Sequence, residues 1–423
     1  MLNNKNILVG VTGSIAIYKT LELIRLYIKA GANVKVIMTQ SAQKFITPLT
    51  FETISQSRVL NEESESWDKE SIYNHIAIGK WADIFVLAPA SANTINKLSN
   101  GIADNLLTQT ALAYPRMKLL CPAANTNMIT NPITKASLKM LGLCNYKIVE
   151  PVSKELACRD IGNGAMCEVE DIFYATACEL LKEAYWENRK VVISGGGSVE
   201  KIDDVRYLSN FSSGKMASSL ALALYLKGAD VCLVSSRGHE SLPKAIHIIE
   251  VQSADEMFEY LQDSLRVAKK GKLTATTLMD SSNPTLIQKT PYLFMAAAVS
   301  DYLPAFKQEG KLKKELLGNS WSLELKQNRD ILSDLDKEGI ITIGFKAEMD
   351  ERTAFTHAKN MMNKKNLNGV CLNILSKENP FGSNSNVIEL LLENKEETFK
   401  YEGNKLLLSL ELLEKLQEVF NEQ

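Results

Sequence analysis

One pattern, a strand followed by a glycine-containing turn, a helix and a second strand, occurs at the start of the chain and again near its middle. Residues 7–11 are an apolar run of strand length, and Thr12, Gly13 and Ser14 form the expected turn. Residues 18–30 carry apolar side chains at near-helical spacing, and residues 34–38 are the next apolar run. Two strands joined by a helix in this way pair in parallel, with a right-handed crossover.

The second copy of the pattern begins at Lys190. We predict a strand over residues 190–193, a glycine-rich turn over 194–198, a helix from Gly214 to Leu226 and a strand over 231–234. Each copy starts a new βαβ unit of the nucleotide-binding type. The sequence therefore predicts an α/β protein with two doubly wound, Rossmann-like domains.

The predicted boundary lies just before Lys190, so that the domains cover residues 1–189 and 190–423. A charged helix over residues 171–189 is expected to end the first domain. The polar stretch 269–290, rich in Ser and Thr, is expected to be a surface loop that precedes a strand over residues 292–297.

Composition excludes several classes of protein. The formal net charge of −2 gives no general attraction to nucleic acids or anionic membranes. No window reaches the roughly 18 apolar residues of a membrane helix, and the N-terminus lacks an export signal. We therefore expect a cytoplasmic protein with small-molecule substrates. The seven scattered cysteines and four histidines indicate free thiols and no zinc site.

In the first half, Gly13 and Ser14 lie where a strand meets a helix N-terminus. This position suits an anion, although a tight turn explains the glycine equally well. Residues 82–90 are predicted to be a buried strand that enters a polar turn at 91–94. Ligands of open α/β sheets bind at such strand ends.

Three further residues of the first half carry suitable reactive groups. His75 suits acid–base chemistry, or is a structural histidine. Asn125 follows a predicted strand over residues 118–121 and is a substrate ligand or a turn former. Cys158 precedes the glycines at 162 and 164, and this context favours a reactive thiol on a mobile loop.

In the second half, residues 206–216 combine Arg206, Asn210 and Lys215 ahead of a helix. Because Met216 follows Lys215, the segment lacks the GxxxxGK[ST] pattern, which disfavours a Walker-type NTPase. Residues 296–302 are predicted to be a buried strand that ends on Asp301, a ligand for Mg2+ or ribose, or a turn cap.

Two other segments of the second half join this set. The lysines within residues 311–314 are either a solvated charge run or a phosphate clamp. Gly344 and Phe345 are expected at the end of a further strand, where they pack or take part in a site.

Taken together, these segments resemble a known family. Residues 12–16, 88–94, 103–108 and 122–128 resemble flavin-dependent cysteine decarboxylases, and residues 206–216, 301–311 and 344–348 resemble an acyl-activating ligase. Over residues 5–420 the chain is similar to the bifunctional phosphopantothenoylcysteine decarboxylases/phosphopantothenate–cysteine ligases of coenzyme A synthesis.

For the first half, the resemblance implies a flavodoxin-like domain in which FMN oxidises the cysteinyl thiol, CO2 leaves, and the reduced flavin returns the electrons. It implies that His75 is the base, that Asn125 holds the substrate carboxylate and that Cys158 donates the final proton. The implied FMN-binding residues are Gly13, Ser14, Thr39, Ser91, Asn93 and Thr94. Ala124, Ile129 and Arg159 depart from the family's methionine, tryptophan and glycine.

For the second half, the resemblance implies that CTP activates 4'-phosphopantothenate as an acyl-cytidylate, which L-cysteine then attacks, with Mg2+ balancing phosphate charge. Arg206 and Asn210 would handle the intermediate, and Asp301 the metal. The implied CTP-binding residues are Met295, Ala296, Ala297, Asp301, Lys311, Arg329, Asp330, Ile331, Leu332, Phe345 and Lys365. Met361 stands where a second nucleotide-binding lysine is frequent, with Lys359 nearby.

The resemblance also implies a homo-oligomer, commonly a dodecamer. The product of its ligase step is the substrate of its decarboxylase step, which gives a reason for the fusion. Two other hypotheses remain. In one, a single half is active; in the other, the chain is a non-catalytic, flavin-binding regulatory subunit.

Overall fold

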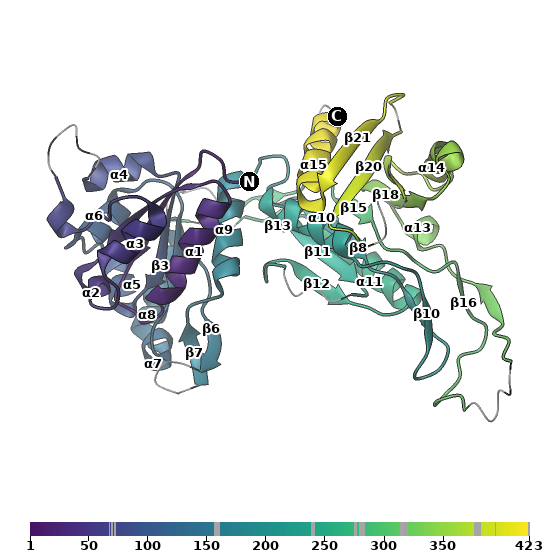
Figure 1. The fold of residues 1–423 in the computed structure, drawn as a ribbon, viewed down its shortest axis with the longest axis horizontal. Helices are drawn as coiled ribbons and strands as arrows, with labels where there is room; N and C mark the ends of the chain where they lie inside the picture. The colour runs from purple at the N-terminus through teal and green to yellow at the C-terminus, as the bar shows by residue number, and fades with distance from the viewer. Residues whose placement is uncertain are drawn as a thin grey trace. The chain divides into compact units, whose positions relative to one another are not determined.

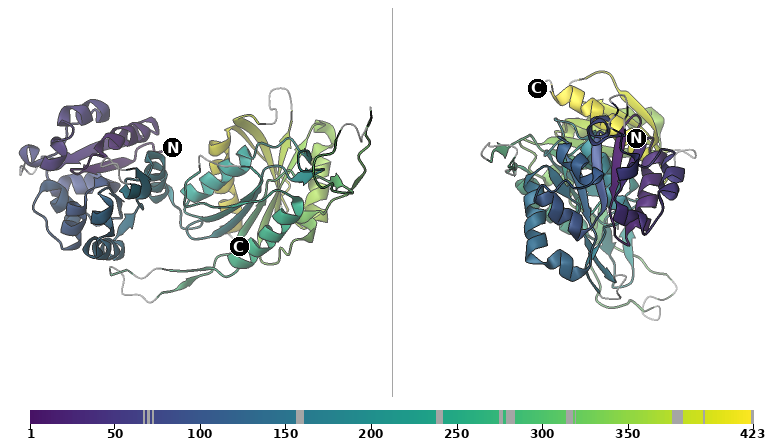
Figure 2. Two further views of the ribbon diagram at one scale, coloured as in Figure 1. Left: turned by 90° about the horizontal axis from the view of Figure 1, so that it is seen from below. Right: turned by 90° about the vertical axis from the view of Figure 1, so that its left-hand side faces the viewer.

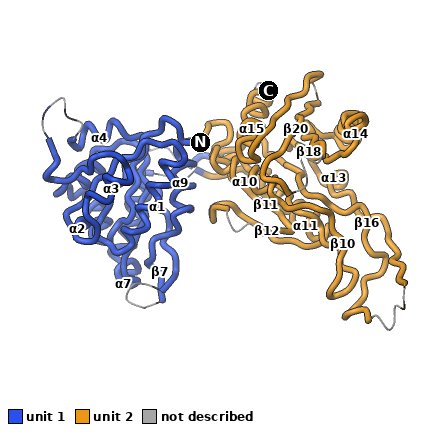
Figure 3. The backbone as a smooth tube through the Cα atoms, in the orientation of Figure 1, with its two compact units in different colours: residues 1–181, 274–285 blue, residues 182–273, 286–423 orange. Residues whose placement is uncertain are grey.

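A computed structural model describes residues 1–66, 68, 71, 73–155, 161–237, 242–274, 277–278, 284–313, 318, 320–375, 382–393 and 395–421. The chain forms two compact units (Figure 3). The first unit contains residues 1–181 and 274–285, and the second contains residues 182–273 and 286–423.

The first unit contains the purple, N-terminal part of the chain (Figure 1). It is built on a five-stranded parallel sheet in the order β2-β1-β3-β4-β5. This is the flavodoxin-like order of doubly wound folds. Its strands are β1 (Asn6–Val11), β2 (Asn33–Met38), β3 (Ile84–Ala90), β4 (Lys118–Pro122) and β5 (Tyr146–Ile148). A separate antiparallel hairpin is formed by β6 (Val152–Glu155) and β7 (Ile161–Ala165).

Helices cover both faces of this sheet (Figure 2). On one face α1 packs against α3 and α9, and on the other α4 packs against α6 and α5 against α8. Burial on both faces explains why the strands are near-continuous apolar runs. The helices are α1 (Ile17–Lys29), α2 (Gln40–Gln43), α3 (Pro48–Ser55), η1 (Glu62–Ser64), α4 (His75–Trp81), α5 (Ala92–Ser99), α6 (Leu106–Ala113), α7 (Thr126–Thr130), α8 (Pro132–Leu143) and α9 (Val169–Leu181).

The second unit is built on an eight-stranded mixed sheet in the order β12-β11-β8-β15-β18-β19-β20-β21. The six parallel strands follow the 3-2-1-4-5-6 order of Rossmann folds, and β20 and β21 extend the sheet antiparallel. The strands are β8 (Lys190–Gly195), β11 (Asp230–Ser235), β12 (His247–Glu250), β15 (Tyr292–Met295), β18 (Ile341–Glu348), β19 (Gly369–Ile374), β20 (Ser385–Leu392) and β21 (Phe399–Asn404). Both predicted α/β folds are therefore confirmed.

Helices also cover both faces of the second sheet. One buried cluster joins α11, α13 and α14 to the strands, whereas α10 packs against α15. The helices are α10 (Lys215–Leu226), α11 (Ala254–Ala268), α13 (Ile331–Asp334), α14 (Glu351–Lys364) and α15 (Lys405–Asn421). Three antiparallel hairpins pair β9 (Val199–Lys201) with β10 (Tyr207–Ser209), β13 (Lys272–Leu273) with β14 (Leu286–Ile287), and β16 (Tyr302–Pro304) with β17 (Leu325–Gln327).

The helix expected over residues 171–189 is shorter than predicted. It ends at Leu181, and residues 182–189 belong to the second unit. There Trp186 is fully buried, and the Tyr185 hydroxyl lies 2.6 Å from the Tyr292 hydroxyl on β15. Burial of these aromatic rings overrides the charged, helical character of the segment.

Three strand predictions in the second unit also differ from the structure. β15 ends at Met295 rather than at residue 297, and residues 296–299 form a half-buried loop that leads to an exposed Asp301. Hydrogen bonds to β8 and to the residue after it hold this segment, because the Ala297 amide donates to Ser194 Oγ at 3.1 Å and the Ala298 amide donates to the Gly196 carbonyl at 2.8 Å. Gly344 and Phe345 lie within β18, not at its end. Residues 269–290, expected as a loop, contain β13 and β14.

Candidate functional site

Thr12 ties together the two loops that begin at the carboxyl ends of β1 and β3. Its buried hydroxyl donates to the Pro89 carbonyl at 2.7 Å and accepts from the Ser91 amide at 2.9 Å. Ser91 in turn caps α5, since its hydroxyl accepts from the Thr94 amide at 3.4 Å. Thr12 thereby fixes the position of a helix N-terminus relative to the first turn of the sheet.

A cavity of about 610 Å3 is lined by these loops. The starts of α5 and α6 both contribute to its wall, and the free amides of helix N-termini favour an anionic group. All six residues predicted to bind the cofactor line this cavity: Gly13, Ser14, Thr39, Ser91, Asn93 and Thr94. The structure therefore brings the whole predicted set together.

Among the described charged side chains in the wall of this cavity, three are acidic and one, Lys97, is basic. Lys97 Nζ lies 2.5 Å from Asp104 Oδ2, and this hydrogen bond lowers the pKa of Asp104. Glu62 and Glu63 also line the cavity. An anion in this cavity would therefore be bound mainly by backbone amides and by hydroxyl and amide side chains.

Gly13 is required by packing as well as by any ligand. A Cβ atom at this position would lie 2.7 Å from the Ser41 Cβ and 3.2 Å from the Ser41 carbonyl carbon. The turn that carries Gly13 and the helix α2 that carries Ser41 both line the cavity. The glycine thus allows a close approach of this turn to α2.

A second cavity, of about 670 Å3, adjoins the first and shares Ser14, Ala123 and Ala124 with it. Asn125 lies in its wall. The Asn125 side chain caps α7 by accepting from the Asn127 amide at 2.9 Å. The predicted carboxylate-binding residue therefore lies beside the predicted cofactor site.

The β6–β7 hairpin forms another side of this second cavity. Lys154 from β6 and Lys19 from α1 both form ion pairs with Glu168, the latter at 3.6 Å, and all three residues line the cavity. Lys19 also donates to the Met166 carbonyl at 3.3 Å. Cys158, the predicted proton donor, lies outside the described residues, as does Arg159.

His75 is the first residue of α4 and follows the helix cap Asn74. Its Nδ1 lies 3.2 Å from Glu65 Oε1. His75 is absent from the described walls of both cavities, whereas Glu62 and Glu63, which precede its partner in the sequence, line the first one. Within one chain, the structure does not place His75 and Asn125 in a common cavity.

The two described departures from the family pattern occupy different environments. Ala124 lies in the wall between the two cavities, where its small side chain leaves room. Ile129 is 4% exposed and belongs to the hydrophobic core of the first unit. The presence of isoleucine instead of tryptophan at this position therefore affects the packing of α7 against the core.

In the second unit, a cavity of about 510 Å3 lies at the carboxyl ends of β15 and β18. Most of the predicted nucleotide-binding residues line it: Met295, Ala297, Asp301, Arg329, Asp330, Ile331, Leu332, Phe345 and Lys365. Ala296 lines an adjoining cavity, and Lys311 lies in neither described wall. Met361 also faces this cavity, and Lys359 is not in its wall.

Lys365 and Asp330 form an ion pair inside this cavity, with Nζ and Oδ1 2.8 Å apart. Burial acts to raise the pKa of Asp330, but hydrogen bonds from Lys365 and Ser333 outweigh it and keep that pKa below its ordinary value. Arg329 also has acidic neighbours, Asp255 at 3.6 Å and Asp334 at 3.5 Å. These cations are held in place before any ligand binds.

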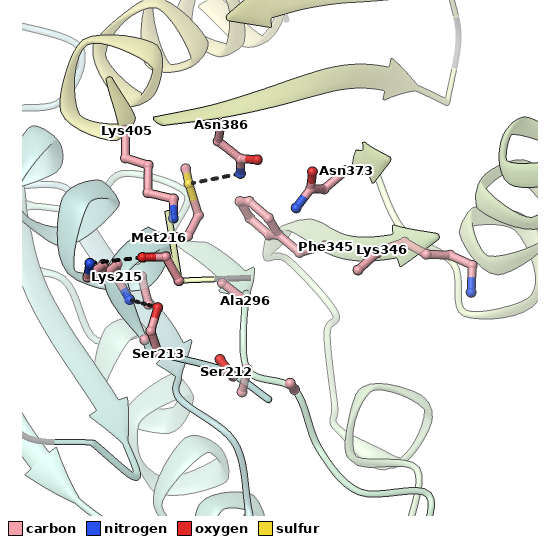
Figure 4. Close-up of a pocket in the computed structure, with 16 residues that line it drawn as sticks. Ser212, Ser213, Lys215, Met216, Ala296, Phe345, Lys346, Asn373, Asn386 and Lys405 are labelled. Atoms are coloured by element: carbon pink, nitrogen blue, oxygen red, sulfur yellow. Dashed lines mark hydrogen bonds between the residues drawn. The ribbon is translucent and has the colours of Figure 1, made fainter. Parts of the chain in front are cut away.

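The adjoining cavity, of about 180 Å3, is shown in Figure 4. Lys215 and Lys405, the first residues of α10 and α15, both line it, together with Asn386 from β20. Lys215 Nζ donates to the Gly382 carbonyl at 2.9 Å and to Asn384 Oδ1 at 2.8 Å. Burial, and then the nearby Lys215 ammonium, lower the pKa of Lys405.

Arg206 and Asn210 lie next to the β9–β10 hairpin. Asn210 Nδ2 donates to the Val299 carbonyl at 3.0 Å, so it is held against the loop that leads to Asp301. Arg206 Nη2 donates to the Leu312 carbonyl at 2.8 Å, which places it beside the loop that carries Lys311. The predicted residues for the intermediate and for the phosphate clamp are thus neighbours.

Asp301 offers a carboxylate at the cavity surface, and its carbonyl accepts from the Asn328 amide at 2.8 Å. In the described part of the chain, no cluster of three or more His, Cys, Asp or Glu residues is arranged to hold a metal. The six described cysteines form no disulfide with one another.

Several lining residues were not predicted from the sequence. In the first unit they include Lys19, Lys97 and Lys154, and in the second they include Asn373 and Lys405. Lys19 lies in the helix that follows the Gly13 turn, so it could have been predicted as a site residue from its position near that turn. The others come from elements without a motif.

Comparison with protein families gives two matches. The family described as Flavoprotein matches residues 1–180. The family described as the C-terminal domain of DNA/pantothenate metabolism flavoproteins matches residues 186–276 and 268–420.

Similar proteins span nearly the whole chain. The Coenzyme A biosynthesis bifunctional protein CoaBC of Haemophilus influenzae is 37% identical over 93% of this chain and 92% of its own length. That of Bacillus subtilis is 35% identical over 98% of this chain and 97% of its own. That of Escherichia coli is 31% identical over 96% and 95%.

Two similar solved structures each correspond to one part of the chain. A PPC decarboxylase mutant complexed with pantothenoylaminoethenethiol is 34% identical and covers 41% of this chain and 97% of its own, with a TM-score of 0.38. The C-terminal domain of a CoaBC protein is 23% identical and covers 56% of this chain and 98% of its own, with a TM-score of 0.42.

Proposed function

Because this chain belongs to the family of bifunctional coenzyme A biosynthesis proteins, we propose that its two units catalyse consecutive steps. The second unit joins 4'-phosphopantothenate to L-cysteine, and the first decarboxylates the product to 4'-phosphopantetheine. The observation that carries this proposal is that each unit has its own cavities at the carboxyl ends of its parallel strands, lined by most of the described candidate residues. By sequence, we assign residues 1–189 to the decarboxylase domain and 190–423 to the ligase domain.

The residues of the first cavity fit FMN. A phosphate would be bound by the amides at the start of α5 and by Ser14, Ser91 and Thr94, and about 610 Å3 lies within the usual range for cofactor sites. When bound, FMN supplies reversible oxidation of the cysteinyl thiol. The match of residues 1–180 to flavoproteins supports this assignment.

The adjoining cavity is proposed to bind the substrate. Asn125 would donate its side-chain amide to the carboxylate that leaves as CO2, and the shared wall at Ser14 and Ala124 would place that carboxylate next to the flavin. His75, oriented by Glu65, is the proposed base. Cys158 is the proposed proton donor.

In the second unit, we propose that CTP occupies the cavity beneath Phe345, with Lys365, Arg329 and Lys311 directed toward its phosphates. Lys215 and Lys405 in the adjoining cavity add positive charge for a phosphorylated substrate. Mg2+ would be held by Asp301 and by the nucleotide phosphates, since Mg2+ commonly needs one or two protein carboxylates. Asn210 and Arg206 would orient the acyl-nucleotide for attack by cysteine.

We further propose that the chain works as a homo-oligomer in the cytoplasm, as a dodecamer by family resemblance. Exposed apolar side chains occur on and next to the β9–β10 and β16–β17 hairpins of the second unit, which is a feature of protein–protein contacts. They are Val205, Tyr207, Phe211, Tyr302, Phe306, Trp321 and Leu325. Among the described residues, no helix has the length and apolar character of a transmembrane segment.

The first experiment is the visible absorption spectrum of the purified chain, with the released cofactor identified by mass. Bound FMN is expected, and each step should then be assayed on the same preparation. A colourless protein that takes up no added FMN would refute the decarboxylase assignment. Ligation without decarboxylation, or the reverse, would show that a single unit is active.

A further inference from the structure

Asp203 lies in the turn between β9 and β10, and its side chain is completely shielded from solvent. Five N–H groups donate to its carboxylate. Oδ1 accepts from the Val205 amide at 2.8 Å and the Arg206 amide at 2.7 Å. Oδ2 accepts from Arg206 Nε at 3.0 Å, Arg206 Nη2 at 2.6 Å and the Leu312 amide at 3.1 Å.

The two carboxylate oxygens therefore have different roles. The Oδ1 contacts, with two backbone amides just after Asp203, are those of an ordinary aspartate turn, and such a turn forms without any contact to Oδ2. The Oδ2 atom accepts from the guanidinium of nearby Arg206 and from the backbone amide of Leu312, which is more than one hundred residues away in the sequence. A charged carboxylate that is buried away from water is stable only when hydrogen-bond donors replace the lost water. The buried Asp203 carboxylate therefore depends on these three contacts.

Arg206 is held from three sides by this arrangement. Besides Asp203, the Leu312 carbonyl accepts from Nη2 at 2.8 Å, and the guanidinium carbon lies 5.2 Å from the centre of the Trp321 ring. An arginine bound in this way has few accessible rotamers. The guanidinium is thus oriented before any substrate arrives.

The loop that carries Lys311 is anchored at the residues on both sides of it. The Leu312 amide binds Asp203, and the Gly310 amide donates to Asp204 Oδ2 at 2.9 Å. The Gln308 amide also donates to the Ile202 carbonyl at 2.9 Å. The Asp203 carboxylate contacts both the Arg206 guanidinium and this loop.

We propose that Asp203 is a positioning residue of the ligase, which holds Arg206 and the Lys311 loop in a fixed relation so that the two cations act together on the phosphates of the acid substrate and the nucleotide. This inference rests on the proposed ligase function of the second unit. Asp203 contacts no substrate itself; it acts through Arg206 and Leu312.

The protonation state of Asp203 supports this role. Burial acts to raise its pKa, but the hydrogen bonds from Val205, Arg206 and Leu312 outweigh it and hold that pKa far below the ordinary value. The carboxylate is therefore charged throughout the pH range of an enzyme assay. Its contacts with Arg206 and Leu312 are expected to persist across that range.

Asp203→Asn tests the proposal, because an amide can keep the Oδ1 turn contacts but cannot accept three hydrogen bonds at the other position. In the full-length protein, the ligase kcat is expected to fall by about 10- to 100-fold, as for a misplaced catalytic group, and the KM for CTP to rise. Decarboxylation of 4'-phosphopantothenoylcysteine by the same chain should be unchanged. The melting transition reports whether the second unit folds.

Asp204→Asn is the matched control. It removes the same charge from the neighbouring position, yet its amide oxygen can still accept from Gly310, so ligation should stay within about twofold of the original protein. Asp203→Glu, which restores a displaced carboxylate, should recover part of the activity. If both Asp203 variants are as active as Asp204→Asn, the proposal is wrong.

A double-mutant cycle separates positioning from a general structural effect. In an Arg206→Gln background, Asp203→Asn should cost less than about threefold more, because the contact with Arg206 is already lost and only the contact with the Leu312 amide remains to be broken. A further loss as large as in the original protein would overturn the role assigned to Arg206. If the unaltered protein makes no acyl-nucleotide or amide, the proposed ligase function fails instead.

Discussion

Replacement of Thr12 by valine tests whether the contact between β1 and β3 builds the flavin site. Valine has nearly the same shape but lacks the hydroxyl, so the 2.7 Å bond to the Pro89 carbonyl and the 2.9 Å bond from the Ser91 amide are both lost. Thr12 is 1% exposed, and water cannot replace these partners. At about 1–1.5 kcal/mol for each bond, the cost is about 2–3 kcal/mol.

This loss has two expected readouts. For a unit of this size, each kcal/mol shifts the melting midpoint by about 2–4 °C, so the first unit should melt about 4–12 °C earlier. The Ser91 amide also loses the contact that positions the start of α5. If about half of the free energy serves that purpose, the Kd for FMN rises about 5- to 10-fold. Scanning calorimetry and titration of the flavin-free protein measure both.

Thr12→Ser is the matched control, since it keeps the hydroxyl and loses one methyl group. Its expected cost is about 0.8 kcal/mol, the value of one buried methylene-sized group, with no change in FMN affinity. Ligation by the same chain should be unaffected in both variants. If Thr12→Val and Thr12→Ser melt together and bind FMN equally well, the hydroxyl does not organise this site.

Other expected outcomes follow from the same structure. His75→Asn should abolish CO2 release while the flavin absorption is retained; turnover in this variant would exclude His75 as the base. Burial lowers the pKa of Lys118 to about 8, so between about pH 8 and 10.5 the unfolded chain binds more protons and the free energy of unfolding rises with pH; Lys118→Met should flatten this rise in urea titrations of the first unit. Met361→Lys should lower the KM for CTP about fivefold, the effect of about 1 kcal/mol from one added charge contact; an unchanged KM would place the phosphates elsewhere.

The two βαβ openings could be predicted because their apolar runs are buried on both faces of a parallel sheet. Residues 7–11 and 190–193 are largely apolar on both faces of their strands, which makes them easy to recognise in the sequence. The glycine turns mark the point at which each strand ends and the segment leading to the next helix begins. The antiparallel strands β20 and β21 were not predicted. They lie at one edge of the sheet, where alternating polar and apolar residues give a weaker signal.

The segment 182–189 shows why the end of the predicted helix was misplaced. Its charged residues continue the helical pattern of α9, but Tyr185 and Trp186 pack against Tyr292, which is far away in the sequence. Arg189 also stacks on the Tyr185 ring, with the guanidinium carbon 3.9 Å from its centre. Local propensity contains no information about such long-range aromatic contacts.

The candidate sites divide in the same way. Gly13, Ser14 and Ser91 could be found because strand ends in parallel sheets meet at one edge, where a motif on one strand lies beside a motif on the next. Lys154 comes from a hairpin, and no local pattern distinguishes it from a surface lysine. Asp203 was overlooked because its significance lies in contacts with residue 312.

The lysines of the smaller second-unit cavity show a further kind of signal in the sequence. Lys215 and Lys405 are the first residues of their helices, where the helix dipole disfavours a cation by about 0.3–1 kcal/mol each. Lys405 is also 8% exposed, so its charge is largely removed from water. Choices that oppose local stability are expected at functional sites, and an anionic substrate in this cavity would offset them. A cation at a helix start is therefore a more specific indicator of the proposed anion site than the charge run at residues 311–314, because Lys311 lines neither described cavity of this unit.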